Sequence, residues 1–204
     1  MKNSFDTIVL ASNNAGKLHE LQDMLSSSDI KVIPQAAFEV ADAIEDGLSF
    51  VENAIIKARH ACKQTGLPAI ADDSGLEVDY LQGEPGIYSA RYSGLHGDDK
   101  GHNRVILEKL KSVPHRDRRA RFQCVLAFMR HANDPTPLIC QASWQGFILE
   151  AEQGSHGFGY DPLFWVPEKS CSAAELPKEE KYRLSHRGRA LKLFLQMFRE
   201  TYCS

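Results

Sequence analysis

The sequence has few cysteines, no excess of basic charge and no long hydrophobic run, and each shortage excludes a class of protein. Its five cysteines lie far apart, at positions 62, 124, 140, 171 and 203, and none is in C-x-x-C spacing. We therefore expect neither a disulfide framework nor a zinc knuckle, and we expect a reducing compartment. The 24 basic and 27 acidic residues give a net charge of −3, so nonspecific binding to nucleic acid is not expected.

Hydrophobic stretches are too short for export or for a membrane. The N-terminal run Ile8 to Ala11 is shorter than the apolar region of a secretion signal. No window approaches the roughly 18 apolar residues of a membrane span. We therefore expect a cytoplasmic protein without a membrane partner. With 204 residues, 43% of them hydrophobic, the chain can bury an ordinary core, and we predict a single domain over residues 1–204.

Strand-like and helix-like patterns alternate along the chain, which is typical of an α/β fold. A hairpin-like segment at 130–137 joins two long strands and favours a mixed sheet. In the first half we predict strands at 6–11 and 30–33, separated by a helix carrying Leu18, Leu21 and Leu25, and then a helix over 50–64 closed by Gly66. A strand at 67–71 runs into turn residues 72–75, and another strand follows at 76–81. After a glycine-rich loop at 83–101 we predict a helix near 103–113, the two long strands and a C-terminal helix beginning at Ser185.

The polar loop SNNAGK, between the first predicted strand and helix, has the character of an anion site. Backbone amides at Asn13, Asn14 and Gly16 can turn toward an anion, and Lys17 opens a helix whose dipole favours negative charge. Leu18 stands where a Walker A loop needs a Ser or Thr, so this loop is not a magnesium-binding P-loop. We predict a phosphate site here, and a plain turn with a solvated lysine is the alternative.

Two adjacent acids, Asp72 and Asp73, directly follow the buried segment 67–71. Open α/β sheets place ligands beyond the carboxyl ends of their strands, which favours a functional role. Because neighbouring side chains of an extended segment point to opposite sides, only one acid can readily face a given pocket. The pattern does not choose between them, and two turn-forming acids before Ser-Gly are the alternative.

A further carboxylate can join one of these aspartates around Mg²⁺, which prefers hard oxygen ligands. Glu45 and Asp46, just before Gly47, are the candidates. On the helix that follows, Asn53 and Lys57 are i, i+4 neighbours that can face a shared cleft. The alternative for Lys57 is a simple solvated lysine.

Two segments in the last third of the chain suggest recognition of a flat ligand with acceptor atoms. In SHGFGYDP, Phe158 stands on a glycine-flanked loop, where its ring can support a base or, alternatively, fill the core. Asp161 adds an acceptor nearby. In KYRLSHRGRAL, the candidate N-cap Ser185 is followed by His186 and Arg187 rather than by acids, and cations oppose the helix dipole there. A bound anionic or acceptor-rich ligand would offset that cost. The alternative is that these side chains extend into water or pair with acids such as Glu179 and Glu180.

The chain resembles the inosine triphosphate pyrophosphatase family from residue 8 to about 195. The motifs that carry the resemblance, in the family's order, are ASNNAGK, EDGLSFVENAIIKARHA, ADDSGLEVDYL with PGIYSARYSG, GFGYDPLF and SHRGRAL. The resemblance implies a long mixed β-sheet flanked by helices, with two lobes around a central nucleotide-binding cleft, and a homodimer. It also implies hydrolysis of dITP, ITP and XTP to the monophosphate and pyrophosphate, which keeps deaminated purines out of DNA and RNA.

The resemblance further assigns roles to residues of this chain. It implies that Glu45 and Asp73 bind Mg²⁺, that Asp73 is the proton acceptor, and that Lys17 and Lys57 act on the phosphates. Asn13 stands where many members have Gly, and we expect the loop to keep its shape because Asn tolerates left-handed backbone. The implied substrate-binding residues are Ser12, Asn13, Asn14, Ala15, Gly16, Lys17, Ser74, Phe158, Gly159, Tyr160, Asp161, Lys181, His186 and Arg187.

The implied base-binding residues offer a basis for selectivity, because Lys181, His186 and Arg187 supply hydrogen-bond donors. Hypoxanthine and xanthine present a 6-oxo acceptor, whereas the amino group of adenine would leave these donors unpaired. Two other classes of protein are the alternatives. A catalytically silent nucleotide sensor would bind a triphosphate without turning it over, and a small kinase would transfer phosphate or release orthophosphate.

Overall fold

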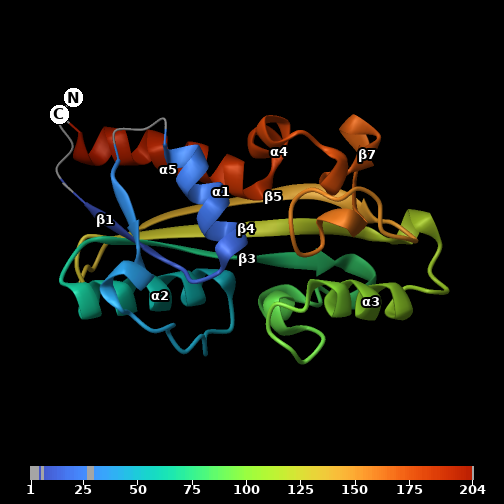
Figure 1. The fold of residues 1–204 in the computed structure, drawn as a ribbon, viewed down its shortest axis with the longest axis horizontal. Helices are drawn as coiled ribbons and strands as arrows, with labels where there is room; N and C mark the ends of the chain where they lie inside the picture. Colours follow the sequence, from blue (N-terminus) through green and yellow to red (C-terminus); the bar gives the residue numbers. More distant parts are fainter. Residues whose placement is uncertain (1–4, 6, 27–29, 204) are drawn as a thin grey trace. The chain divides into compact units, whose positions relative to one another are not determined.

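The strands within the described residues form one seven-stranded sheet. It is a mixed sheet, as the sequence predicted. The computed structural model describes residues 5, 7–26 and 30–203. Its strands are β1 (Ile8–Ala11), β2 (Val32–Pro34), β3 (Ala69–Val78), β4 (Arg119–Met129), β5 (Leu138–Ile148), β6 (Phe164–Val166) and β7 (Cys171–Ser172). They lie in the order β2-β1-β3-β4-β5-β6-β7 (Figure 1). β1 pairs in parallel with β2 and β3, whereas β6 pairs antiparallel with β5 and β7.

The helices begin and end where capping residues allow. Ser49 accepts a hydrogen bond from the amide of Glu52 at the start of α2, and Gly66, with φ of 71°, ends that helix as predicted. Within residues 5, 7–26 and 30–203, none of the helices has the length and apolar character needed to cross a membrane. The helices are α1 (Ala15–Leu25), α2 (Phe50–Thr65), α3 (Asp99–Lys109), α4 (Lys178–Leu184) and α5 (His186–Tyr202).

The chain divides into two compact units, and β3, β4 and β5 contribute to both. The predicted single domain, the predicted cleft between two lobes and the predicted homodimer stay predictions. Residues 1–4, 6, 27–29 and 204 of the predicted domain lie outside the described part of the chain. The first unit is Met1–Asp73, Cys124–Ala142 and Arg187–Ser204, and the second is Ser74–Gln123 and Ser143–His186.

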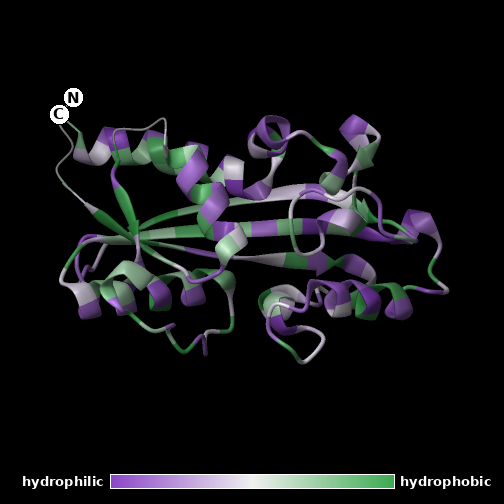
Figure 2. Ribbon diagram, viewed as in Figure 1, coloured by the Kyte–Doolittle hydropathy of each residue, from purple (hydrophilic) through white to green (hydrophobic). Residues whose placement is uncertain are grey.

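In the first unit, the sheet is covered on both faces. Helices α1 and α5 lie on one face and α2 on the other (Figure 1). Strand β1 is hydrophobic along its length and buried throughout (Figure 2), as expected for a strand covered on both sides. Its residues Ile8 and Leu10 pack with Leu21 of α1 and Phe194 of α5. Alternation along the strand then directs Val9 to the face that α2 covers.

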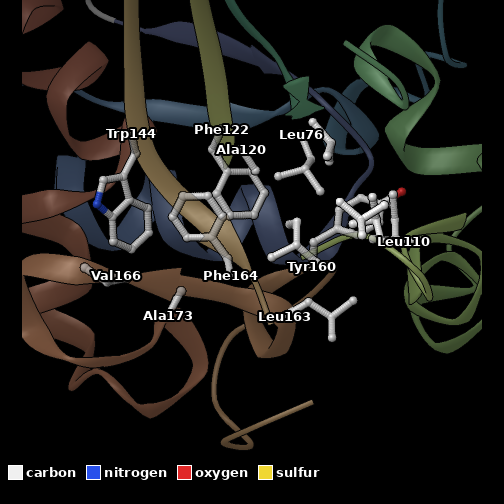
Figure 3. Packing of buried hydrophobic residues seen from close by; sticks show 14 of the residues in the cluster. Leu76, Leu110, Ala120, Phe122, Trp144, Tyr160, Leu163, Phe164, Val166 and Ala173 are labelled. Atoms are coloured by element: carbon white, nitrogen blue, oxygen red, sulfur yellow. The ribbon is translucent and has the colours of Figure 1, made fainter. Parts of the chain in front are cut away.

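The second unit has its own core, built around aromatic side chains. The rings of Phe122 and Phe164 lie 4.5 Å apart, and Trp144 lies 5.1 Å from Phe164 (Figure 3). Helix α3 adds Ile106, and its C-cap residue Leu110 joins the same cluster. The segment that precedes β6 contributes Tyr160 and Leu163 to this core, which anchors it.

The prediction of a turn at residues 72–75 is wrong, because β3 runs unbroken through them. Asp, Ser and Gly favour turns locally, but β4 lies beside β3 in the sheet and holds the segment extended. β1 pairs with β3 only as far as Ala11 opposite Ala71. Asp72 and Asp73 therefore lie just beyond the carboxyl end of β1, as α/β ligand sites do, yet inside β3.

The other predicted elements differ from the structure only at their ends. Helix α3 begins at Asp99 rather than near 103, because Asp98 accepts a hydrogen bond from the amide of Gly101 and caps it earlier. The strand predicted at 76–81 ends at Val78, where a 3₁₀ turn begins. The helix over 50–64, the strands joined by 130–137 and the helix that follows Ser185 are confirmed.

Candidate active site

The two adjacent aspartates of β3 lie at the centre of the candidate site, on opposite faces of the sheet. Asp72 faces the side of α1 and α5, where its carboxylate lies 2.9 Å from Nζ of Lys17 and 3.0 Å from Nε of Arg187. Asp73 faces the side of α2, where its Oδ1 lies 2.6 Å from Nζ of Lys57. The alternation of a β-strand produces this division, as predicted, and all five residues belong to the first unit.

Asp72 is held in a buried ionic network. Its side chain is fully buried, and its Oδ2 also accepts a hydrogen bond from Sγ of Cys124 at 3.1 Å. Burial alone would raise the pKa of Asp72, but the charges of Arg187 and Lys17 outweigh it and hold the pKa well below 3.8. Arg187 also donates to Glu20 of α1. Asp72 is therefore an ionised carboxylate that fixes the head group of Lys17.

Asp73 has fewer hydrogen-bond partners than Asp72 among the described residues. Lys57 lies between Oδ1 of Asp73 and Oε1 of Glu45, at 2.6 and 3.5 Å. The other carboxylate oxygen of Asp73, Oδ2, is buried and has no hydrogen-bond partner among the described residues. Burial raises the pKa of Asp73 above 3.8, although Lys57 opposes the shift. An incompletely bonded, desolvated carboxylate of this kind is typical of a functional site.

The pair Glu45 and Asp73 fits the requirements of a Mg²⁺ ion. Both carboxylates approach the same ammonium group, so they also lie close to each other. The buried Oδ2 of Asp73 offers an oxygen with no other bond. Within the described ranges, no group of three or more His, Cys, Asp or Glu side chains gathers as a metal cage. Mg²⁺ in nucleotide enzymes commonly needs only one or two carboxylates, since phosphates and water complete its coordination.

The first turn of α2 shapes the loop that carries Glu45. Oδ1 of Asn53 accepts a hydrogen bond from the amide of Gly47 at 3.0 Å. A side chain at Gly47 would lie 2.7 Å from that oxygen, so only glycine allows this approach. Glu52 accepts from the amide of Leu48 as well. Asn53 and Lys57 therefore face the same acidic loop, as their helical spacing predicted.

The predicted phosphate loop is a capped helix N-terminus. Asn14 caps α1 by accepting from the amide of Lys17 at 3.0 Å, and Ser12 accepts from the amide of Asn14. The amides of Ala15 and Gly16, in the first helical turn, have no partner within the helix and are suited to an anion. In the described part of the chain, positive φ outside glycine occurs at Glu39, Gln82 and Ser170, so the backbone at Asn13 is not left-handed. That the loop keeps the family's shape stays a prediction.

The predicted base-binding loop belongs to the second unit and is tightly bonded. Its glycines, Gly157 and Gly159, have φ of 77° and 63°. A side chain at Gly157 would lie 2.1 Å from Oδ2 of Asp161, which accepts from the amide of Phe158 at 2.9 Å. Lys181 donates to the same oxygen at 2.6 Å and lies 5.1 Å from the centre of the Phe158 ring. Phe158 is half-buried, and its backbone is held by the hydrogen bond to Asp161.

The remaining predicted binding residues lie in different surroundings. Tyr160 is buried, and its hydroxyl donates to the carbonyl of Ser89 at 2.8 Å. Ser74 follows Asp73 in β3 and is half-buried. The ring of His186 stacks on Phe122 at 4.7 Å. Tyr160, Ser74 and His186 belong to the second unit, whereas Arg187 belongs to the first.

The unfavourable cation at the start of α5 is offset by carboxylates of the protein itself. Arg187 is matched by Asp72 and Glu20, both buried. Glu180, a predicted alternative partner, pairs instead with Lys169 and Arg183. Sequence reasoning missed Glu20 and Cys124. The signal for Glu20 was its position three residues after Lys17, on the same face of one helix.

The fold and this cluster place the chain among α/β proteins with a lysine and carboxylate site at the carboxyl end of a parallel strand. Residues 8–197 match the model of the Ham1 family. The dITP/XTP pyrophosphatase of Vibrio cholerae serotype O1 is 56% identical over 197 residues, which cover 96% of this chain and 98% of that protein. The dITP/XTP pyrophosphatase of Escherichia coli O157:H7 is 56% identical over 192 residues, with 94% and 98% covered.

Solved structures agree with this relation. A HAM1 protein from Coxiella burnetii superposes with a TM-score of 0.88 at 50% sequence identity, covering 96% of this chain and 99% of that chain. The Ham1 protein of Staphylococcus aureus gives 0.83 at 41% identity, covering 96% and 98%. The chain belongs to the Ham1 family, which confirms the family and the mixed α/β fold inferred from the motifs.

Proposed function

We propose that the chain hydrolyses non-standard purine nucleoside triphosphates, including dITP, ITP and XTP, to the nucleoside monophosphate and pyrophosphate. Family membership and the names of the relatives support this activity. The structural observation that supports it most is Asp73, a buried carboxylate that pairs with Lys57 beside Glu45 and has one oxygen without a hydrogen-bond partner among the described residues. Removal of these triphosphates would keep deaminated purines out of DNA and RNA.

The phosphates would be bound by the N-terminus of α1 and by two lysines. Ser12, Asn13, Asn14, Ala15, Gly16 and Lys17 form the loop that would hold them. The net effect of burial and of the charges of Asp72 and Asp73 is to raise the pKa of Lys17, so its ammonium is charged at neutral pH. Lys17 and Lys57 would stabilise the pyrophosphate as it leaves.

Glu45 and Asp73 would hold Mg²⁺, which when bound supplies positive charge against the phosphates and makes water more acidic. In the structure the ammonium of Lys57 lies between the two carboxylates and reduces the repulsion between them. That arrangement keeps the two acids close together before the substrate arrives.

Asp73 would accept the proton of the attacking water. The water oxygen bonds to the α-phosphorus, the bond from that phosphorus to the bridging oxygen breaks, and pyrophosphate leaves with the electron pair. The observation that supports this role is the buried Oδ2 of Asp73, which has no hydrogen-bond partner among the described residues. Asp72, whose pKa is lowered, would hold Lys17 rather than take a proton.

The base would stack on Phe158, with Ser74, Gly159, Tyr160, Asp161, Lys181, His186 and Arg187 completing the predicted binding set. Donors among these residues would match the 6-oxo acceptor of hypoxanthine and xanthine. A base that leaves buried donors unpaired is rejected far more strongly than one that differs only in shape. We further propose that the chain acts as one domain, in the cytoplasm, as a homodimer.

Product analysis tests this proposal. dITP, XTP, dATP and dGTP would be incubated at equal concentration, with and without Mg²⁺, and pyrophosphate separated from orthophosphate. We expect pyrophosphate and monophosphate from dITP and XTP, far slower turnover of dATP and dGTP, and no turnover without Mg²⁺. Tight binding of triphosphates without turnover would favour a sensor, and orthophosphate or a phosphorylated acceptor would favour a kinase. Equal turnover of all four nucleotides would contradict the role assigned to the base-binding residues.

A further inference from the structure

Two side chains of helix α3 form hydrogen bonds with the base-binding loop at a single residue, Gly159. Oδ2 of Asp99 accepts a hydrogen bond from the amide of Gly159 at 2.7 Å. Nδ2 of Asn103 donates to the carbonyl of the same glycine at 3.2 Å. The two side chains are four residues apart, on one face of α3. Both polar groups of Gly159 are therefore bonded to one rigid element, and all three residues belong to the second unit.

The geometry of Asn103 is fixed by its partners. Nδ2 donates both to the Gly159 carbonyl and to Oε1 of Glu152, at 3.2 and 2.7 Å, and both partners can only accept. Oδ1 of Asn103 is buried with no hydrogen-bond partner among the described residues. An unbonded buried acceptor costs free energy, so stability alone does not explain an asparagine at this position.

The positions of the residues on either side of Gly159 depend on the same two hydrogen bonds from α3. Phe158, the proposed support for the base, directly precedes it, and the Phe158 amide is bonded within the loop to Asp161. Tyr160 follows it and stacks on His102 of α3, 6.1 Å away. His102 is itself fixed by the amide of Ser93. Helix α3 therefore determines where the short segment from Phe158 to Tyr160 stands within the second unit.

We propose that Asp99 and Asn103 are positioning residues that set base selectivity, by fixing the Phe158 loop through Gly159. This inference rests on the proposed function, in which the base stacks on Phe158. Neither residue has to contact the substrate. Selection between a 6-oxo base and its competitors depends on placing the ring and the donors to within a fraction of an ångström, and a displacement of about 1 Å is enough to lose such discrimination.

Kinetics of two variants test the inference. Asp99→Ala and Asn103→Ala each remove one of the two hydrogen bonds between α3 and Gly159. We expect kcat/KM for dITP relative to dGTP to fall by about tenfold in each, mainly because KM for dITP rises while kcat changes by less than about threefold. The Mg²⁺ concentration for half-maximal activity should not change. Asp99→Asn keeps an oxygen acceptor for the Gly159 amide and should restore most of the selectivity.

Asp98→Ala is the matched control, because Asp98 caps the same helix and accepts hydrogen bonds from Gly101 and from the hydroxyl of Ser93 rather than from Gly159. It removes a cap, so it should lower stability without changing selectivity. Hydrogen exchange of the amides in residues 157–161 gives a second readout. Exchange there should accelerate in Asp99→Ala and not in Asp98→Ala.

Unchanged selectivity and unchanged exchange in folded Asp99→Ala and Asn103→Ala would overturn the inference. Loss of selectivity in Asp98→Ala to the same extent would do so too, since it would reduce the effect to helix stability. A wild-type chain that releases no pyrophosphate would instead contradict the proposed function. The exchange measurement would still report whether α3 fixes the loop.

Discussion

Asp72 and Asp73 are identical side chains one residue apart, and their surroundings move their pKa values in opposite directions. Both are desolvated, which raises a carboxyl pKa. The charges of Arg187 and Lys17 outweigh that effect at Asp72, whereas those of Lys57 and Lys17 do not outweigh it at Asp73, where the charge of Glu45 adds to the rise. We infer that Asp72 maintains the framework and Asp73 takes part in the reaction.

Substitution of Asp72 should destabilise the fold. Asp72→Asn would leave Lys17 and Arg187 buried without their common counter-charge. Removing one partner of a buried ion pair costs about 3–5 kcal/mol, so we expect the free energy of unfolding in urea to fall by that amount. Asp46→Asn, at an exposed position of the acidic loop, should change it by less than about 0.5 kcal/mol. Equal stability of both variants would contradict the structural role assigned to Asp72.

The hairpin between β4 and β5 depends on one buried aspartate. Asp134 accepts hydrogen bonds from Nε of Arg130 at 2.8 Å, from the Arg130 amide at 3.0 Å and from the Thr136 amide at 3.1 Å. The Arg130 side chain lowers the pKa of Asp134 below 3.8, against a smaller effect of burial. A lowered native pKa stabilises the fold above the unfolded value, and this contribution is lost as pH falls through the native pKa.

The lowered native pKa of Asp134 predicts how the stability of Asp134→Asn depends on pH. At pH 7 the variant should be less stable than the wild type by about 1 kcal/mol, a small value because solvent screens the partly exposed Arg130. The difference should begin to shrink as pH falls below 3.8, because the unfolded wild-type chain then gains a proton at this carboxyl, and it should be lost when the native carboxylate is protonated as well. Urea unfolding across this pH range measures it. A difference that is constant with pH would mean that charge pairing does not hold the hairpin.

Strand β3 shows how far sequence patterns can define an element. Helical spacing predicted α1, α2 and α5, because their apolar residues repeat locally. The Asp-Asp-Ser-Gly segment also carries a local signal, for a turn, and there the signal is wrong. Pairing with β4, more than 40 residues away in sequence, keeps it extended. No local pattern contains that information.

The candidate site was predictable in part for the same reason. Alternation along a strand predicts that Asp72 and Asp73 point to opposite sides, but it does not show which cation each one meets. The grouping of Lys57 with Glu45 and Asp73 was inferred from resemblance, and the structure brings the three together. Glu20 and Cys124 come from elements whose packing on β3 is set by the core of the first unit. Their roles needed tertiary structure.

For the whole molecule, we expect magnesium to be required for activity and not for folding. The ammonium of Lys57 already pairs with Glu45 and Asp73, so the two carboxylates do not depend on a metal to stay close together. Treatment with EDTA should abolish pyrophosphate release and change Tm by less than about 2 °C in a thermal melt. Unfolding on chelation would indicate a structural metal instead.

The measurement that tests the central claim most directly is pyrophosphate release from dITP by Asp73→Asn. The substitution keeps the shape of the side chain but removes both its charge and its capacity to accept a proton. We expect kcat to fall by at least about a thousandfold, with Tm retained and the nucleotide still bound. A variant that is folded, binds dITP and releases pyrophosphate within about tenfold of the wild-type rate would contradict the role of Asp73.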